Sequence, residues 1–338
     1  MEFLYQYGLF FAKTITFVIA IAIIMAIIAS AAHKPKSKKG EIQLEDVSAN
    51  LDELKADFLA STLKKDELKK WKKAQKKSEK SLEKETDKKL YVIDFKGSID
   101  ANEVDQLREE VTAILTIARP DKDQVLIRLE SGGGVVHGYG LAASQLQRIK
   151  NAKIELTICV DKVAASGGYM MACVADKLVA APFSIIGSIG VIAQIPNFNK
   201  ILKKNDVDFE QITAGEFKRT LTLFGENTDQ ARDKFREEIQ QTHELFKTFV
   251  SHERPNLNIS EVATGEHWFA TQAFDKGLVD KIATSDDILL EANKERQIFK
   301  VQFTMKKSMT EKLGIGLSLS IEKAVIKLMS AINVLKPH

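Results

Sequence analysis

The chain has 338 residues, of which 44% are hydrophobic, and a formal net charge of +3 at pH 7. This length and apolar content allow one large domain or two ordinary ones, with a sizeable core. The small net charge argues against a nucleic-acid-binding protein, so no nucleic-acid partner is expected.

An uncharged run occupies residues 14–32, close to the N-terminus. It is long enough to cross a hydrocarbon core of about 30 Å. A cleaved signal peptide is the alternative, because Ala29-Ser30-Ala31 resembles a cleavage site. The apolar run is long, and the region before it carries little positive charge. Both features favour a transmembrane anchor at residues 1–33 with membrane lipid as its partner. Lysines at 34–39 then place the bulk of the chain in the cytoplasm by the positive-inside rule.

Residues 34–89 are rich in lysine and read as a helical spacer. Apolar residues recur at spacings of three and four from Leu44 to Phe58, which predicts a helix starting near residue 43. The pattern fades beyond Lys64. A solvated helix is the main interpretation, and a short coiled coil or a strip touching anionic lipid are the alternatives.

The globular part is expected at residues 90–300. Strands are predicted at 91–95, 124–129 and 154–160, with helices at 100–118 and 138–150. This alternation predicts an α/β fold with a mostly parallel, covered sheet. Further apolar stretches lie at 177–181 and 185–195, followed by a predicted strand near 208–213 and a long helix at 228–253. Residues 301–338 form a C-terminal tail whose amphipathic part, 318–335, would cover a neighbouring subunit, a membrane surface or the chain itself.

The two cysteines, Cys159 and Cys173, lie in apolar stretches without metal-type spacing. They are expected to be small buried side chains, with a disulfide between them as the alternative. No cluster of metal-ligating residues stands out, and no metal is expected.

Ser166 is the most informative residue, because it stands among very small residues where a predicted strand gives way to a helix. Small neighbours allow a sharp turn and the approach of a substrate carbonyl. The first amides of the following helix lack intrahelical partners and point at whatever lies before them. The pattern is typical of a nucleophile; the alternative is a tightly packed turn with an N-capping serine.

The glycines at 132–134 follow a buried strand but lack both the Rossmann spacing and a P-loop lysine. Their exposed backbone can instead donate amides to a developing oxyanion. A serine nucleophile also needs a base, and none of the histidines, such as His137 or His243, has a convincing partner. A lysine whose pKa is lowered by burial is the alternative, and Lys218 stands in a small-residue turn after a predicted strand.

Residues from about 91 to 282 resemble the SohB/signal peptide peptidase A family of membrane-bound serine peptidases. Several motifs in the family's order carry the resemblance: Glu130-Ser131-Gly132-Gly133-Gly134, residues 161–170 around Ser166, Gly187-Ser188-Ile189-Gly190, residues 215–220 around Lys218, residues 265–268 and residues 277–280.

The resemblance implies a ClpP/crotonase-like fold and a Ser–Lys dyad that needs no metal or organic cofactor. Ser166 matches the nucleophile, Lys218 the general base, and Ser188 a serine that orients the base. The oxyanion would be held by Gly133 or Gly134 together with the amide of Ser166. Gly132 departs from the family pattern, which has proline there; this loses stiffness but removes no donor.

The expected function is that of a membrane-anchored serine endopeptidase acting on unfolded proteins or membrane-derived peptides, such as signal-peptide remnants. Family members form rings or domes, so a homo-oligomer is expected. The expected location is the bacterial inner membrane. The charges that flank the membrane segment favour a cytoplasmic catalytic domain, whereas the resemblance to the family favours a periplasmic one. A non-catalytic membrane scaffold and an acyl-CoA enzyme on the same fold are the alternatives.

Overall fold

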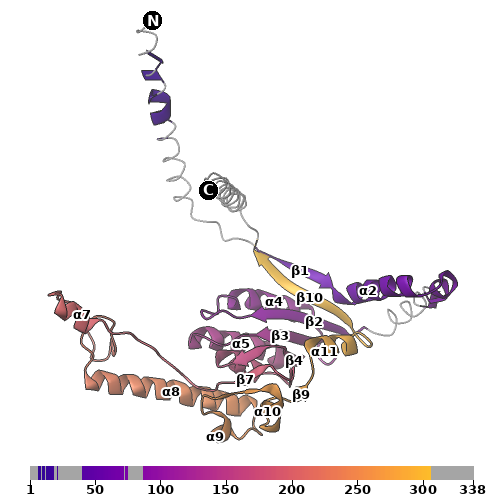
Figure 1. Cartoon of the computed structure of the whole chain (residues 1–338). Coiled ribbons are helices and arrows are strands. Elements are labelled where there is room, and N and C mark those ends of the chain that lie inside the picture. Colours follow the sequence, from indigo (N-terminus) through magenta and orange to yellow (C-terminus); the bar gives the residue numbers. More distant parts are fainter. Residues whose placement is uncertain are drawn as a thin grey trace, which may run out of the picture. The chain divides into compact units, whose positions relative to one another are not determined.

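The computed structural model describes residues 7–8, 10–11, 13–18, 21, 40–71, 73–74 and 87–305 (Figure 1). Most of the expected membrane segment at 14–32, part of the expected spacer and the amphipathic tail at 318–335 lie outside these residues. Within the described ranges, no helix combines the length and the apolar character needed to cross a membrane. One compact unit spans residues Ile42–Thr304, and the terminal segments form a second.

A seven-stranded sheet forms the centre of this unit, in the order β1-β10-β2-β3-β4-β6-β9. The pairs from β10 to β9 along this order are all parallel, which confirms the predicted mostly parallel sheet in a mixed α/β fold. The strands are β1 (Gly40–Asp46), β2 (Lys89–Lys96), β3 (Gln124–Glu130), β4 (Glu155–Val160), β6 (Lys177–Ala180), β9 (Lys281–Ile282) and β10 (Gln297–Met305).

Both faces of the sheet are buried, as the continuous apolar run in β2 requires. Tyr91 and Ile93 belong to one core, and Leu90 and Val92 belong to a second core on the opposite face. The first core is covered by α4 (Val104–Ile117), α5 (Val136–Asn151) and α6 (Gly167–Ala172). The second is covered by α11 (Ser285–Ala292) and the start of α2 (Val47–Thr62).

The expected helices of the globular part are confirmed. In α4, the residues at spacings of three and four face the first core and are almost fully buried. The long helix is α8 (Asp229–Glu253), which begins where the hydroxyl of Thr228 accepts a hydrogen bond from the amide of Ala231. Such a cap satisfies one of the amides that a helix start leaves unpaired.

Two expected elements differ in the structure. The helix expected from residue 43 begins at Val47, because residues 40–46 form β1 and the Asp46 side chain caps α2 by accepting from the amide of Ala49 at 2.9 Å. The strand expected near 208–213 is wrong: that stretch is exposed and has no regular structure. Without a neighbouring strand, alternating apolar residues gain neither ladder hydrogen bonds nor burial.

A small second sheet, β5-β7-β8, positions the functional residues. It contains β5 (Val163–Ala165), β7 (Ile185–Gly187) and β8 (His267–Phe269), with β5 parallel to β7 and β7 antiparallel to β8. The structure also contains α7 (Asn199–Lys204), α9 (Ile259–Val262) and α10 (Ala270–Asp275). We call residues 191–228 the arm; in Figure 1 its helix α7 lies at the far end of α8 from the sheet.

Candidate active site

Three loops meet where β3, β5 and β7 end. The amide of Ser131 donates to the carbonyl of Val163 at 2.9 Å, and the amide of Ala165 donates back to the carbonyl of Ser131 at 3.0 Å. The amide of Ser166 donates to the carbonyl of Gly187 at 2.8 Å. The segments that follow the three strands are therefore neighbours, at the carboxyl ends where α/β folds commonly bind ligands.

Ser166 stands between β5 and α6 with φ 53° and ψ −120°, a conformation that a residue with a side chain rarely adopts. The turn is held by close packing: a Cβ added to Gly167 would overlap the ring of Tyr139, and one added to Gly168 would overlap the carbonyl of Ser131. Such a tight strand-to-helix turn exposes a serine hydroxyl in front of a helix. The small residues that singled out Ser166 in the sequence are thus required by the packing.

Ser188 follows β7 and also has a φ of 53°. Its amide donates to the carbonyl of Glu266 on the chain leading into β8, at 2.7 Å. Because Ala165 and Gly187 are register partners in the parallel pair β5–β7, Ser166 and Ser188 leave adjacent strand ends in the same direction. The structure therefore brings these two expected site residues together.

The glycine loop lies against Ser166. Gly133 has a φ of +86°, and a Cβ added to it would lie 2.7 Å from the Cβ of Ser166 and 2.6 Å from the amide nitrogen of Gly167. A Cβ on Gly134 would overlap the carbonyl of Ile99. The loop has no room for side chains at these two positions.

The available amide donors include one of those expected, Gly134, and differ in the others. The amide of Ser166 donates to Gly187, as described above, and the amide of Gly133 donates to the hydroxyl of Ser131 at 3.1 Å, so neither is free in this structure. Over the described part of the chain, the amides of Gly134 and Gly167 have no hydrogen-bond acceptor. Gly167 was missed from the sequence, although its place as the first residue of the helix is the signal that points to it.

Lys218 lies exposed on the arm, and among the residues that the structure describes no hydrogen bond joins it to either serine. Its neighbour Phe217 has its ring centroid 5.3 Å from the Nζ of Lys234 on α8. Nine residues further along α8, the Nε2 of His243 lies 3.1 Å from the carbonyl of Ile189, beside the serines. At 1.5 Å per residue, these two points of α8 are about 14 Å apart.

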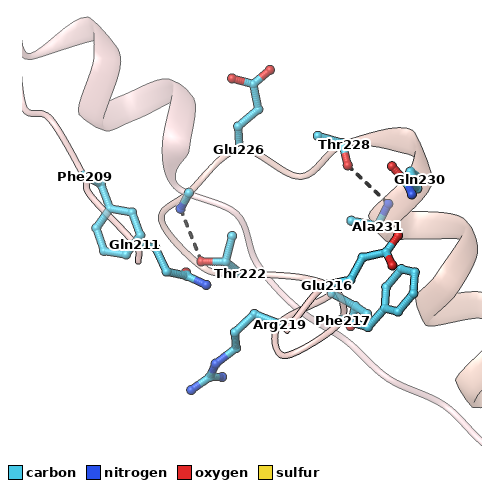
Figure 2. Close-up of a pocket in the computed structure, with 12 residues that line it drawn as sticks. Phe209, Gln211, Glu216, Phe217, Arg219, Thr222, Glu226, Thr228, Gln230 and Ala231 are labelled. Atoms are coloured by element: carbon cyan, nitrogen blue, oxygen red, sulfur yellow. Dashed lines mark hydrogen bonds between the residues drawn. The ribbon is translucent and has the colours of Figure 1, made fainter. Parts of the chain in front are cut away.

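A hollow of about 440 Å³ lies beside the Lys218 turn, between the arm and the start of α8 (Figure 2). The chain neighbours of Lys218, Phe217 and Arg219, line it together with Phe209. None of the expected serines or loop glycines does. The hollow therefore belongs to the arm and is separate from the loops around Ser166.

Cys159 and Cys173 are buried free thiols, which confirms their expected role as small core residues. Burial raises the pKa of Cys159 to about 12, and it raises the pKa of Cys173 as well. Thiols held protonated in this way are poor nucleophiles and poor metal ligands. Within the residues described, no three or more His, Cys, Asp or Glu side chains are grouped so that they could hold a metal ion.

Comparison with known proteins gives two family matches, which together cover nearly the whole chain. The N-terminal model of peptidase family S49 matches residues 2–146, and the model of peptidase family S49 matches residues 148–298. The chain is 51% identical over 330 residues to the probable protease SohB of Haemophilus influenzae, which covers 93% of this chain and 92% of that protein. It is 52% identical over 305 residues to a probable protease SohB of Buchnera aphidicola, and the match covers 86% of this chain and 99% of that protein. Protease 4 of Haemophilus influenzae is more distant, at 26% over 211 residues, covering 60% of this chain and 34% of that protein.

Proposed function

The chain belongs to peptidase family S49 and is a peptidase, and from this premise we propose that it cleaves peptide bonds with Ser166 as nucleophile and Lys218 as general base. The observation that carries the proposal is the strained turn at Ser166, which lies between the glycine loop and Ser188. Both the strain and the unpaired amides beside it are typical of a site built for nucleophilic attack.

The chemistry follows from these groups. Neutral Lys218 accepts the proton of Ser166 while the serine oxygen attacks the peptide carbonyl, and the protonated amine then protonates the leaving amine. The amides of Gly134 and Gly167 stabilise the oxyanion; one such donor contributes about 3–4 kcal/mol in comparable sites. Ser188 orients the amine of Lys218. Water then hydrolyses the acyl-enzyme, so neither a metal nor an organic cofactor takes part.

We further propose that the globular part has the ClpP/crotonase-like fold. The parallel sheet, and the small sheet that presents the nucleophile at the start of α6, support this assignment.

Lys218 would serve Ser166 of a neighbouring copy in a homo-oligomer. The distance along α8 argues against a direct contact within one chain. The arm also exposes many apolar side chains, which a soluble surface rarely gathers in one segment. They are Ile192, Ile195, Phe198, Ile201, Val207, Phe209, Ile212, Phe217, Leu223 and Phe224.

The proposed substrates are unfolded proteins or membrane-derived peptides, such as signal-peptide remnants. The uncharged run at 14–32 supports an anchor in the bacterial inner membrane. A reporter fused after residue 338 would assign the side of the membrane: activity of a cytoplasmic reporter supports the charge-based orientation, and activity of a periplasmic reporter supports the opposite one.

The test is cleavage of unfolded casein by the full chain in detergent, compared with Ser166→Ala, Lys218→Ala and Lys200→Ala. Lys200 is also an exposed lysine of the arm, which makes it the matched control. We expect turnover by the parent and by Lys200→Ala alone. Substantial cleavage by either of the other variants would refute the dyad.

Mixing the two inactive variants tests the pairing between copies. If Lys218 acts on a neighbouring copy, random assembly of equal amounts of Ser166→Ala and Lys218→Ala gives about a quarter of the sites an intact pair. The mixture should then recover roughly that share of parent activity. A mixture that stays as inactive as its components would show that each chain supplies its own base.

A further inference from the structure

A series of hydrogen bonds through the buried hydroxyl groups of Ser131 and Tyr139 runs beneath the glycine loop. The amide of Gly133 donates to the Oγ of Ser131 at 3.1 Å, this Oγ lies 2.5 Å from the hydroxyl of Tyr139, and the Tyr139 hydroxyl donates to the carbonyl of Ser98 at 2.8 Å. Ser131 is 2% exposed and Tyr139 is fully buried. Water therefore has little access to the hydrogen bond between these two hydroxyl groups, and the bonds to Gly133 and Ser98 are part-buried.

The direction of each hydrogen bond follows from the number of protons. Tyr139 has a single hydroxyl proton and donates it to Ser98, so its oxygen must accept in the contact with Ser131. Ser131 therefore donates to Tyr139, and its remaining lone pairs face the amide of Gly133. The series of hydrogen bonds therefore has a single assignment of donors and acceptors, and it ends at the amide of Gly133 in the loop.

The loop needs such an external restraint because it consists of three consecutive glycines. Gly132 is exposed, and a Cβ added to it would meet nothing within 4 Å, so packing does not hold it. Gly133 adopts a φ of +86°, and glycine leaves the adjacent peptide planes free to rotate. The hydrogen bond to Ser131 fixes the peptide plane that carries the Gly133 amide, and it thereby limits where the next plane, which carries the Gly134 amide, can lie.

Tyr139 also sets the distance between the loop and the nucleophile. Its ring lies where a side chain on Gly167 would be, directly under the first turn of α6, and its hydroxyl lies where a side chain on Gly97 would be. One side chain thus packs under the Ser166 turn and holds the glycine loop beside it.

We propose that Tyr139 is a positioning residue for peptide hydrolysis, which acts through Ser131 to hold the Gly134 amide in place for the oxyanion. This inference rests on the proposed function of the site. It assigns to Tyr139 and Ser131 the restraint that a proline at position 132 would otherwise supply.

The experiment compares Tyr139→Phe and Ser131→Ala with Tyr169→Phe in the full chain in detergent. Tyr169 is the matched control: it is fully buried, and its hydroxyl donates to a backbone carbonyl, that of Leu278, at 3.0 Å, away from the loop. Three quantities are measured: kcat and KM on a peptide substrate, and hydrogen exchange of the peptide covering residues 131–135. The exchange measurement does not depend on peptidase activity.

We expect Tyr139→Phe and Ser131→Ala to lower kcat at least about ten-fold with KM changed less than about two-fold, since a displaced donor weakens transition-state binding. The double variant should have a kcat no lower than that of the poorer single variant, because both substitutions disrupt the same series of hydrogen bonds. Loop exchange should rise in both variants. Tyr169→Phe should lose comparable thermal stability and leave both kcat and loop exchange unchanged.

Unchanged loop exchange in Tyr139→Phe would overturn the inference, whatever the activity, and so would an equal loss of kcat in Tyr169→Phe. Failure of the proposed function gives a different result: the parent itself would not cleave the substrate, while loop exchange would still report on Tyr139.

Discussion

Replacing Gly133 by alanine tests the idea that the glycine loop must lie directly against the nucleophile. The new Cβ would lie 2.6 Å from the amide nitrogen of Gly167, 2.7 Å from the carbonyl oxygen of Ala165 and 2.7 Å from the Cβ of Ser166. Two of these three atoms belong to the backbone and cannot rotate away. The φ of +86° adds a second cost, because alanine is strained there.

The size of the effect follows from these two terms. A left-handed conformation costs an alanine about 1–2 kcal/mol. Overlap in a packed site costs about 1–3 kcal/mol more. We therefore expect the free energy of unfolding to fall by about 2–5 kcal/mol, which lowers the melting temperature by roughly 5–15 °C for a domain of this size. Peptidase turnover should fall at least about a hundred-fold, because the displaced loop loses an oxyanion donor.

The assay is thermal unfolding by circular dichroism together with casein cleavage, on the full chain in detergent. Gly132→Ala is the matched control, since its Cβ would meet nothing within 4 Å and its φ is not in the left-handed region. It should keep parent stability within about 0.5 kcal/mol. If Gly133→Ala were as stable and as active as Gly132→Ala, the close approach of the loop to Ser166 would be refuted.

Two further variants and one labelling experiment test the core and an ion pair. Burial raises the pKa of Glu110 to about 7, so the folded chain keeps a proton that the unfolded chain releases above about pH 4.5. The free energy of unfolding should therefore fall as pH rises between these two values. Glu110→Gln should remove this fall and be about 2–3 kcal/mol more stable than the parent at pH 8. Cys159 and Cys173 should resist alkylation by iodoacetamide in the folded protein and react fully in denaturant, as counted by mass spectrometry. Arg254→Ala should cost about 2 kcal/mol in chemical unfolding, because it breaks a two-pronged ion pair with Asp280 at 2.9 and 2.6 Å.

Each of these has a clear contrary result. A parallel pH dependence of parent and Glu110→Gln would show that Glu110 is not the titrating group. Rapid labelling of either cysteine in the native chain would show that its site opens without unfolding. An Arg254→Ala variant with parent stability would show that the amide of Leu178, which already donates to Asp280, and solvent suffice for this carboxylate.

Local pattern was enough to predict most elements of the large sheet and their helices. Strands such as β2 and β3 are buried on both faces, so their apolar runs are continuous, and α4 carries one apolar stripe; both signals are strong over short windows. The same pattern failed for β1 and for residues 208–213. Pairing with a distant strand decides those positions: β1 lies beside β10, whereas residues 208–213 have no strand partner.

The amino-acid sequence by itself determined the chemistry that is present: a serine in a small-residue turn, a triple-glycine loop and a lysine in a later turn. Family membership follows from those same motifs. Only the tertiary structure decided which groups meet. It joined Ser166 and Ser188 through the pairing of β5 and β7, engaged the Ser166 and Gly133 amides, and left those of Gly134 and Gly167 unpaired. It also separated Lys218 from the serines along α8. Hydrogen bonds and contacts between residues far apart in the chain depend on the packed fold, which no local window of sequence contains.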